Sequence, residues 1–429
     1  MSPARNRWLA TLARLALLVV SLGFTAMVAE LGFRLTGHGA IYDVYTNPSY
    51  LWQKDALLGW SHEPNARGTF IGPRPFPIEY ETPIEINSIG LRGPEIAPKR
   101  QSEYRVLLLG DSVTVGFEVL YEQTFGELMQ KKLERLFQVP VTVINAAVRG
   151  YGTDQLYLYY RERGHALNAD LVMLIQSGND PNDNMSLHRV RKPLGKPALA
   201  LQPDGTLVRV DGPTTDYPLC SAWMLDENFE AKRMDGPLNR LTCELQTYLS
   251  HHSALFSVVA SLLARMPSVV FFLKDLTYPQ KQLDILSNHP EPLFLPWLIE
   301  PAYAAPTRTL AEAERALSTA IIIHLAREVE AHGQRFALIA GMGNRSMLDM
   351  GTIQAAGVAS PVYRAASAPN DILRFRNDGH MNSAGHHRFA EALVPIVIAQ
   401  AMAERPELAR AASGKRPLPR SLRKTLRQN

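Results

Sequence analysis

The sequence predicts an α/β fold, a doubly wound parallel sheet in a flavodoxin-like three-layer α/β/α arrangement. Short, continuously apolar runs predict strands that are buried on both faces, as central strands of a parallel sheet are. Segments with helical spacing lie between these runs, and this alternation favours parallel strands joined by crossover helices. The first three predicted strands are residues 104–109, 141–145 and 171–176.

Helices between and after these strands are predicted from apolar residues spaced three and four apart. Gly164 is the expected end of the second helix, and Gly333 that of the third. A fourth strand follows the third helix, and one last helix closes the domain. The predicted helices are 124–137, 154–163, 309–332 and 382–404, and the fourth strand is 335–340.

The α/β domain is expected to span residues 101–405, with an insertion at about 185–305 that interrupts the pattern. Within the insertion, residues 198–210 predict a β-hairpin around Pro203-Asp204-Gly205. Residues 254–273 are apolar enough to raise the question of a membrane span. A charge and a proline interrupt them, and a crossing would put the last third of the chain opposite the first strands, so a buried or membrane-facing pair of short elements is expected.

Both ends of the chain differ from the domain. Residues 1–35 begin with Arg5, Arg7 and Arg14, which precede an uncharged apolar stretch and would hold that end in the cytoplasm. The segment is expected to be an uncleaved signal anchor, with a cleaved signal peptide as the alternative. Either way the remainder is exported, which predicts a single-pass membrane protein with its domain on the extracytoplasmic (periplasmic) side. Residues 36–100 are rich in Pro, Gly and Asn and predict a loop-rich lead-in.

The formal net charge of +4 comes from the C-terminal tail, residues 406–429. From Ser413 onward the tail holds six Lys and Arg residues and no acid, so the rest of the chain is net negative and is not a basic nucleic-acid binder. The tail is expected to be disordered and solvated, with contact to anionic lipid or polymer as the alternative. Cys220 and Cys243 could form a disulfide in an exported protein or remain two buried thiols.

Polar and glycine-rich motifs follow the first three predicted strands, where parallel sheets place their active sites. Gly110-Asp111-Ser112 ends the first strand, and a following helix would favour negative charge beside the serine. Gly150 and Gly152 follow the second strand and can present free backbone N–H groups to a ligand. Asn179 follows the third strand, where its amide could donate to an oxyanion.

A fourth motif lies far downstream, in Asp378-Gly379-His380. An aspartate two residues before a histidine can orient the imidazole through Nδ1 and leave Nε2 to accept a proton from a serine. His386 and His387 are expected on the last helix, facing solvent.

In chain order these motifs supply Ser, Gly, Asn and His, and the sequence here resembles the SGNH/GDSL hydrolase superfamily. Residues 87–93 and 150–155 are similar to a bacterial, membrane-anchored branch of it. The resemblance implies the SGNH hydrolase fold, Ser112 as nucleophile and His380 as general base. It also implies an oxyanion hole made by the N–H groups of Ser112 and Gly150 with the side chain of Asn179.

One position departs from the pattern of many family members, which place the acidic partner three residues before the histidine. That position is Asn377, so Asp378 is assigned instead, as in some polysaccharide acetylesterase and acetyltransferase relatives. No HExxH motif and no Cys/His cluster at ligand spacing occurs, so no metal or other cofactor is expected.

The function favoured by these residues is a serine-dependent ester hydrolase, a carbohydrate O-acetylesterase acting on an acylated small molecule or polysaccharide outside the cytoplasmic membrane. One alternative is an O-acyltransferase that uses the same serine with a multispanning membrane partner as acyl donor. The other is a non-catalytic glycan-binding or assembly protein. The insertion is expected to shape the mouth of the site or to make oligomer contacts.

Overall fold

The computed structural model describes residues 3–36, 51–72, 79–185, 196–210, 241, 245, 248–249, 252–264, 310–341, 345–359 and 370–408. Cys220, Cys243 and the basic residues from 409 onward lie outside these ranges. The predictions of a disulfide and of a solvated tail therefore stay predictions.

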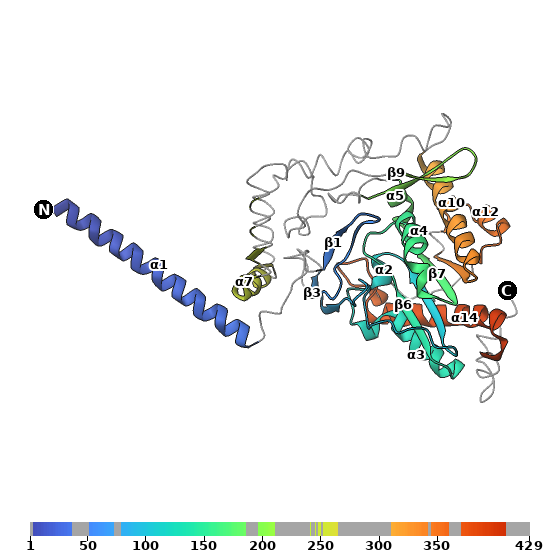
Figure 1. Cartoon of the computed structure of the whole chain (residues 1–429), viewed down its shortest axis with the longest axis horizontal. Helices are drawn as coiled ribbons and strands as arrows, with labels where there is room; N and C mark the ends of the chain where they lie inside the picture. Colours follow the sequence, from blue (N-terminus) through green and yellow to red (C-terminus); the bar gives the residue numbers. More distant parts are fainter. Residues whose placement is uncertain are drawn as a thin grey trace.

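A four-stranded parallel sheet forms the centre of the α/β domain (Figure 1). Its strands lie in the spatial order β10-β7-β5-β6 and pair in parallel throughout. Numbered along the chain, this is the order 2-1-3-4 of flavodoxin-like sheets. The α/β class and the parallel sheet predicted from the sequence are confirmed. The bounds are β5 (Tyr104–Leu109), β6 (Val141–Asn145), β7 (Leu171–Gln176) and β10 (Arg335–Ala340).

Two helices cover each face of this sheet. Val106 and Leu108 of β5 pack with the helices of one face, while Leu107 and Leu109 pack with those of the other. Each fully buried aliphatic side chain of this kind stabilises the fold by about 1.5–3 kcal/mol. One face carries α3 (Phe125–Phe137) and α14 (Ser383–Glu404), and the other carries α4 (Thr153–Glu162) and α10 (Leu310–Ala331).

Gly164 does not end the second predicted helix in the expected way. The chain continues from α4 into a 3₁₀ turn, η4 (Gly164–Leu167), and the left-handed residue is Asn168, with φ 53°. Asparagine tolerates this conformation better than most residues, so it can end the segment in place of glycine. The remaining short helices are α2 (Ser112–Val115), η3 (Tyr121–Gln123), α5 (Asp180–Asn184), α12 (Met350–Ala355) and α13 (Asn370–Leu373).

The predicted loop-rich lead-in contains four strands where the structure describes it, which the sequence analysis did not assign. They form two antiparallel pairs, and their buried aromatic residues join the core on the α4 side of the sheet. Trp60, for example, donates from its indole to the carbonyl of Arg149 at 3.2 Å. These strands fold by packing on the domain, which local composition does not reveal. They are β1 (Trp52–Asp55), β2 (Gly59–His62), β3 (Arg67–Gly72) and β4 (Tyr80–Glu85).

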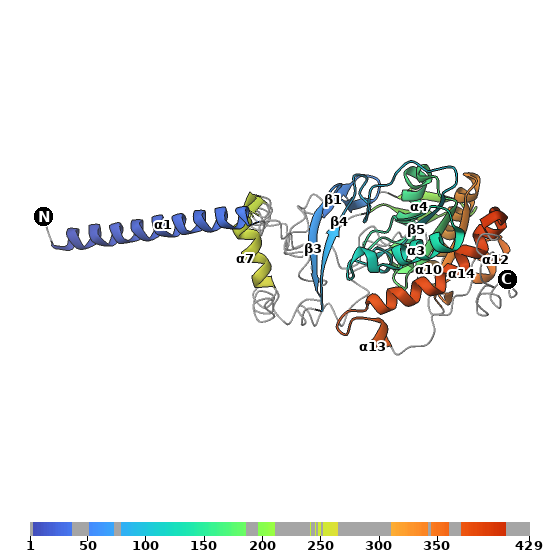
Figure 2. The same cartoon turned by 90° about the horizontal axis from the view of Figure 1, so that it is seen from below.

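The N-terminal helix α1 (Pro3–Leu35) projects away from the domain (Figures 1 and 2). Over residues 11–35 it is long and apolar enough to cross a membrane, and none of that stretch is buried within the molecule. Within the insertion, β8 (Ala198–Leu201) and β9 (Leu207–Val210) form the predicted hairpin. Helix α7 (Ala254–Ala264) forms in the first half of the apolar stretch 254–273, and residues 265–273 lie outside the described part.

Candidate active site

Three of the sequence motifs lie at the carboxyl ends of neighbouring strands. Ser112 follows β5, Gly150 follows β6 and Asn179 follows β7, and β5 lies between the other two strands. The serine is therefore flanked by the other two motifs, as the sheet topology requires.

Ser112 lies at the first position of α2, in a turn that Asp111 fixes. Asp111 caps the helix by accepting from the N–H of Val113 at 3.0 Å, and it also accepts from the hydroxyl of Ser177 at 2.8 Å. The turn is too tight for a side chain at Gly110, where a Cβ would lie 2.1 Å from Thr114 Oγ1. The glycine and the aspartate of the motif thus hold the serine backbone in place.

His380 joins the serine to an aspartate in one hydrogen-bonded chain. Its Nε2 lies 2.9 Å from Ser112 Oγ, and its Nδ1 lies 2.5 Å from Asp378 Oδ1. Asp378 also accepts from the backbone N–H of His380 at 3.0 Å. The three side chains come from opposite ends of the α/β domain, and the fold brings them together in the order that serine hydrolases use.

Tyr80 of the lead-in holds the second oxygen of the aspartate. Its hydroxyl donates to Asp378 Oδ2 at 2.7 Å. Burial alone would raise the pKa of Asp378, but the hydrogen bonds and charge of His380 and the bond from Tyr80 hold this pKa well below its ordinary value. The residue three before the histidine, Asn377, donates its backbone N–H to Glu79 instead.

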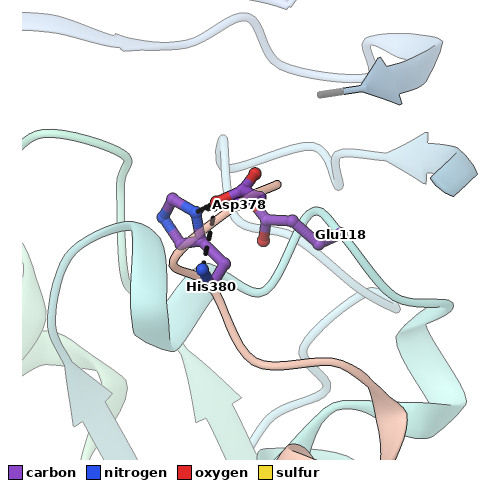
Figure 3. Close-up of side chains that lie close together, drawn as sticks. All are labelled: Glu118, Asp378 and His380. Carbon is purple, nitrogen blue, oxygen red and sulfur yellow. Dashed lines mark hydrogen bonds and ion pairs between the residues drawn. The ribbon is translucent and has the colours of Figure 1, made fainter. Parts of the chain in front are cut away.

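A second carboxylate, Glu118, lies beside His380 and was missed in the sequence (Figure 3). Its Oε1 is 3.5 Å from His380 Nδ1, it is buried, and it pairs with Arg149. Burial would raise the pKa of Glu118, but the charges of Arg149 and His380 outweigh burial and lower this pKa. Nothing in the local sequence around residue 118 marks it, because only the path of the loop after α2 brings it to the histidine.

The two carboxylates set the charge state of the imidazole. Burial lowers the pKa of His380, and Arg149 lowers it too, but the charge of Glu118 and the hydrogen bond and charge of Asp378 outweigh both. The pKa of His380 is therefore raised above its ordinary 6.5. This environment stabilises an imidazolium, which is what a histidine becomes when it accepts a proton.

Glu118, Asp378 and His380 also have ligand-type atoms within 4.8 Å of one another, a spacing that a metal ion could use. Each of these three groups is already engaged in a hydrogen bond in the structure. His380 Nδ1 bonds to Asp378, Tyr80 bonds to Asp378, and Arg149 bonds to Glu118. The donor set therefore fits a proton-carrying hydrogen-bond network better than a cation site.

Gly150 and Asn179 are the two positions expected to form the oxyanion hole together with Ser112. Gly150 adopts φ 78°, a conformation that favours glycine, in the turn after β6. Asn179 begins α5, and its Nδ2 donates to Asp183 Oδ2 at 2.7 Å. The second N–H of that amide is free to serve another acceptor by the chemistry of the group.

His386 is buried, contrary to the expectation that it faces solvent, whereas His387 is exposed as expected. His386 falls on the face of α14 that packs against α3, and its Nδ1 accepts from the N–H of Phe125 at 3.2 Å. Burial lowers the pKa of His386 to about 4, so this histidine is neutral at ordinary pH. It supports the core and does not take part in the hydrogen-bonded chain described above.

Arg92, in the predicted lead-in motif, fixes the loop that carries Glu118. Its buried guanidinium donates to three carbonyls of that loop: Val115 at 2.8 Å, Val119 at 2.7 Å, and Gly116. A planar fork suits this task, because it satisfies several acceptors from one rigid group.

We expect Arg92→Leu to lower the free energy of unfolding by at least about 2 kcal/mol, because it leaves the carbonyls of Val115 and Val119 without this donor, while the Gly116 carbonyl keeps the N–H of Val119. Urea unfolding of the full chain in detergent would measure the change. Arg67→Leu is the matched control, since the Arg67 side chain is 75% exposed. A loss at Arg92 no larger than at Arg67 would contradict the assigned role.

A hollow of about 250 Å³ lies next to this network, bordered by Tyr80, Glu118 and Phe375. Neither Ser112 nor His380 lines it. The hollow therefore borders Glu118 and Tyr80 without reaching the serine hydroxyl.

No protein-family model and no curated protein matches the sequence. Among solved structures, the chain is similar to an acetylxylan esterase from Geobacillus stearothermophilus, with 10% identity, a TM-score of 0.30, and coverage of 68% of this chain and 92% of that chain. It is also similar to the lipase Lip_vut3 from a goat rumen metagenome, with 12% identity, a TM-score of 0.30, and coverage of 68% and 95%. At such low scores, the chemistry of the site rests on its own geometry.

Proposed function

We propose that this chain is a serine ester hydrolase of the SGNH/GDSL type, with Ser112 as nucleophile and His380 as general base. The observation that carries the proposal is the continuous chain from Ser112 Oγ through the imidazole to Asp378, with distances of 2.9 and 2.5 Å. A serine hydroxyl is a weak nucleophile until a base takes its proton, and this geometry provides that base.

The reaction begins with attack of Ser112 Oγ on the ester carbonyl while His380 Nε2 takes the proton. The imidazolium that forms is stabilised by the negative charges of Asp378 and Glu118. It then returns the proton to the leaving alcohol, which leaves an acyl-serine. Water attacks this ester by the same route, with His380 again as base, and releases the acid.

The oxyanion of the tetrahedral intermediate needs hydrogen-bond donors near the serine. The N–H groups of Ser112 and Gly150 and the side chain of Asn179 are assigned to this role. Their positions at the ends of three adjacent strands support the assignment. Loss of one such donor lowers turnover by about 10²–10³ in enzymes that use them.

The substrate class proposed is an O-acetyl ester on a polysaccharide outside the cytoplasmic membrane. Two features support it. The aspartate stands two residues before the histidine, as in polysaccharide-acting relatives of the family that the sequence resembles. In addition, α1 is long and apolar enough to hold the domain at a membrane, and the arginines that precede its apolar stretch favour a cytoplasmic N-terminus.

The test uses the full chain in detergent with p-nitrophenyl acetate as substrate, followed by an O-acetylated polysaccharide from which acetate release is measured. A fluorophosphonate probe, which modifies activated serines, should label Ser112. Labelling and hydrolysis together would support the hydrolase. Labelling without hydrolysis would point to a transferase that needs an acyl donor. The absence of both labelling and hydrolysis would indicate a non-catalytic protein.

Because His380 acts as a base only when it is neutral, activity should rise with pH through its pKa. That pKa is raised, so we expect the acid limb of the kcat/KM profile to lie above pH 6.5. Glu118→Gln removes a charge that favours the imidazolium, so the limb should move to lower pH. Glu122→Gln, at an exposed glutamate on the same segment, is the control. An unmoved limb in Glu118→Gln would show that Glu118 does not act on the histidine.

A further inference from the structure

Helix α7 of the insertion is bonded to the C-terminal end of α1. The carboxylate of Glu30, in α1, accepts from the N–H groups of Ala254 and Leu255 at 3.0 and 2.8 Å. It also accepts from the hydroxyl of Ser253 at 2.9 Å. Glu30 therefore caps α7 from another part of the chain, 224 residues away from Ala254.

Arg34 completes this junction from the next turn of α1. Its Nε pairs with Glu30 at 2.7 Å, and its Nη2 donates to the carbonyl of His252 at 2.6 Å. The positive end of the α7 dipole and the guanidinium both face the carboxylate, so the charge that ends the apolar stretch of α1 is fully compensated. The junction thus belongs at the level where the candidate membrane span ends.

Helix α7 has no charged residue in its 11 residues. The side chains of Val259 and Leu262, three residues apart on one face, are 44% and 58% exposed. A helix this rich in apolar residues needs an apolar environment, and the described part of the α/β domain leaves these two side chains exposed. Helix α7 contacts α1, and Figure 2 shows it lying across the end of α1.

The residues just before α7 extend this apolar surface. Leu241, Leu245 and Tyr248 are helical, and they recur at the four- and three-residue spacing of one helical face. All three are more than half exposed. These three residues and α7 both lie near the end of the candidate membrane span, which indicates that they share an apolar environment.

We propose that α7 and these three residues bind the extracytoplasmic surface of the lipid bilayer, with α7 lying in the interface beside α1. The proposal rests on the membrane placement of α1 put forward above. The charge at the junction is compensated within the chain, and the exposed side chains described in α7 and in these three residues are apolar, which fits acyl chains rather than charged headgroups. The insertion then has a second attachment to the membrane besides the span itself.

One consequence concerns the substrate. Two attachments would keep the domain near the bilayer, so substrates presented near the membrane surface would reach Ser112 more readily. This favours a glycan that is still attached to, or emerging from, the membrane over one that diffuses freely.

The test introduces the photo-crosslinking residue p-benzoylphenylalanine at single positions of the full chain in native membranes. Position 262 reports on α7, and position 22, in the middle of α1, is 61% exposed and reports on the span itself. Position 208, an apolar residue 48% exposed in the β8–β9 hairpin, is the matched control away from α1. After irradiation, mass spectrometry identifies phospholipid or protein adducts.

We expect phospholipid adducts at positions 22 and 262 and none at 208, with loss of the adduct at 262 but not at 22 in a Glu30→Ala background. An adduct at 22 without one at 262 would overturn the proposal and leave the span intact. A protein adduct at 262 would overturn it in favour of a protein partner. No adduct at 22 would refute the membrane placement of α1, and the proposal for α7 with it. None of these outcomes depends on hydrolytic activity.

Discussion

Ser112→Ala and His380→Ala are each expected to lower kcat for p-nitrophenyl acetate by about 10⁶-fold, and the double variant by no more than either alone. The two groups perform one step, since the hydroxyl attacks only as the imidazole takes its proton across 2.9 Å. Removing either group therefore abolishes the step, and removing the second group causes no further loss of rate. The measurement is the steady-state rate of the full chain in detergent, with enzyme concentration fixed by fluorophosphonate titration of the parent protein.

His387→Ala is the matched control for this pair of variants. His387 lies on α14 close to the site in sequence, but it is exposed, and the described structure gives it no part in the hydrogen-bonded chain. Its rate should stay within about twofold of the parent, as for surface changes away from a site. Additive losses in the double variant would contradict a shared step. So would retention of activity in His380→Ala, which would transfer the role of base to another group.

The central sheet could be predicted from the sequence because its strands are buried on both faces. In β5 and β7 every residue is buried, so each strand is a short, mostly apolar run, and its length of six residues favours a strand over a helix. The lead-in strands could not be predicted in the same way. Strand β4 alternates buried and exposed residues and contains a proline, and it pairs only with β3, so the domain against which it packs decides its structure.

The serine, the histidine and its aspartate could be found in the sequence because each lies in a short motif with a fixed local geometry. Tyr80 and Glu118 could not. The tyrosine reaches the aspartate from 298 residues away in the chain, and the glutamate reaches the histidine because Arg92 fixes the loop after α2. Contacts of this kind depend on tertiary structure alone, and neither residue type is unusual at its position.

His386 is a residue whose burial could not be predicted from the sequence. A histidine beside another histidine on a helix gives no local sign of which one is buried. The choice is made by the packing of α14 against α3, which turns His386 inward to accept a hydrogen bond from Phe125.

The last large effect concerns the acid that orients the histidine, where the structure offers two carboxylates. Asp378 is 2.5 Å from Nδ1 and Glu118 is 3.5 Å from it, so Asp378 is the hydrogen-bond acceptor and Glu118 acts through its charge. In Asp378→Asn the amide can donate to Nδ1, which favours the tautomer with its proton on Nε2. That tautomer cannot accept the proton of Ser112, and we expect kcat to fall by about 10⁴-fold.

Two comparisons separate this explanation from a general loss of structure. Tyr80→Phe removes only the bond to Asp378 Oδ2 and leaves the acceptor for Nδ1 in place. It should lower kcat by about 10- to 100-fold, the worth of one hydrogen bond to a charged group. Asn377→Ala changes the neighbouring position, which many members of the superfamily that the sequence resembles use for the acid, and should leave the rate nearly unchanged. If kcat fell by less in Asp378→Asn than in Tyr80→Phe, Glu118 would have to be the acid that orients the histidine. In that case the imidazole would have to turn toward Glu118 and away from Asp378, which now accepts the hydrogen bond of its Nδ1. Glu118→Gln would then abolish hydrolysis and would not merely shift the acid limb of the kcat/KM profile.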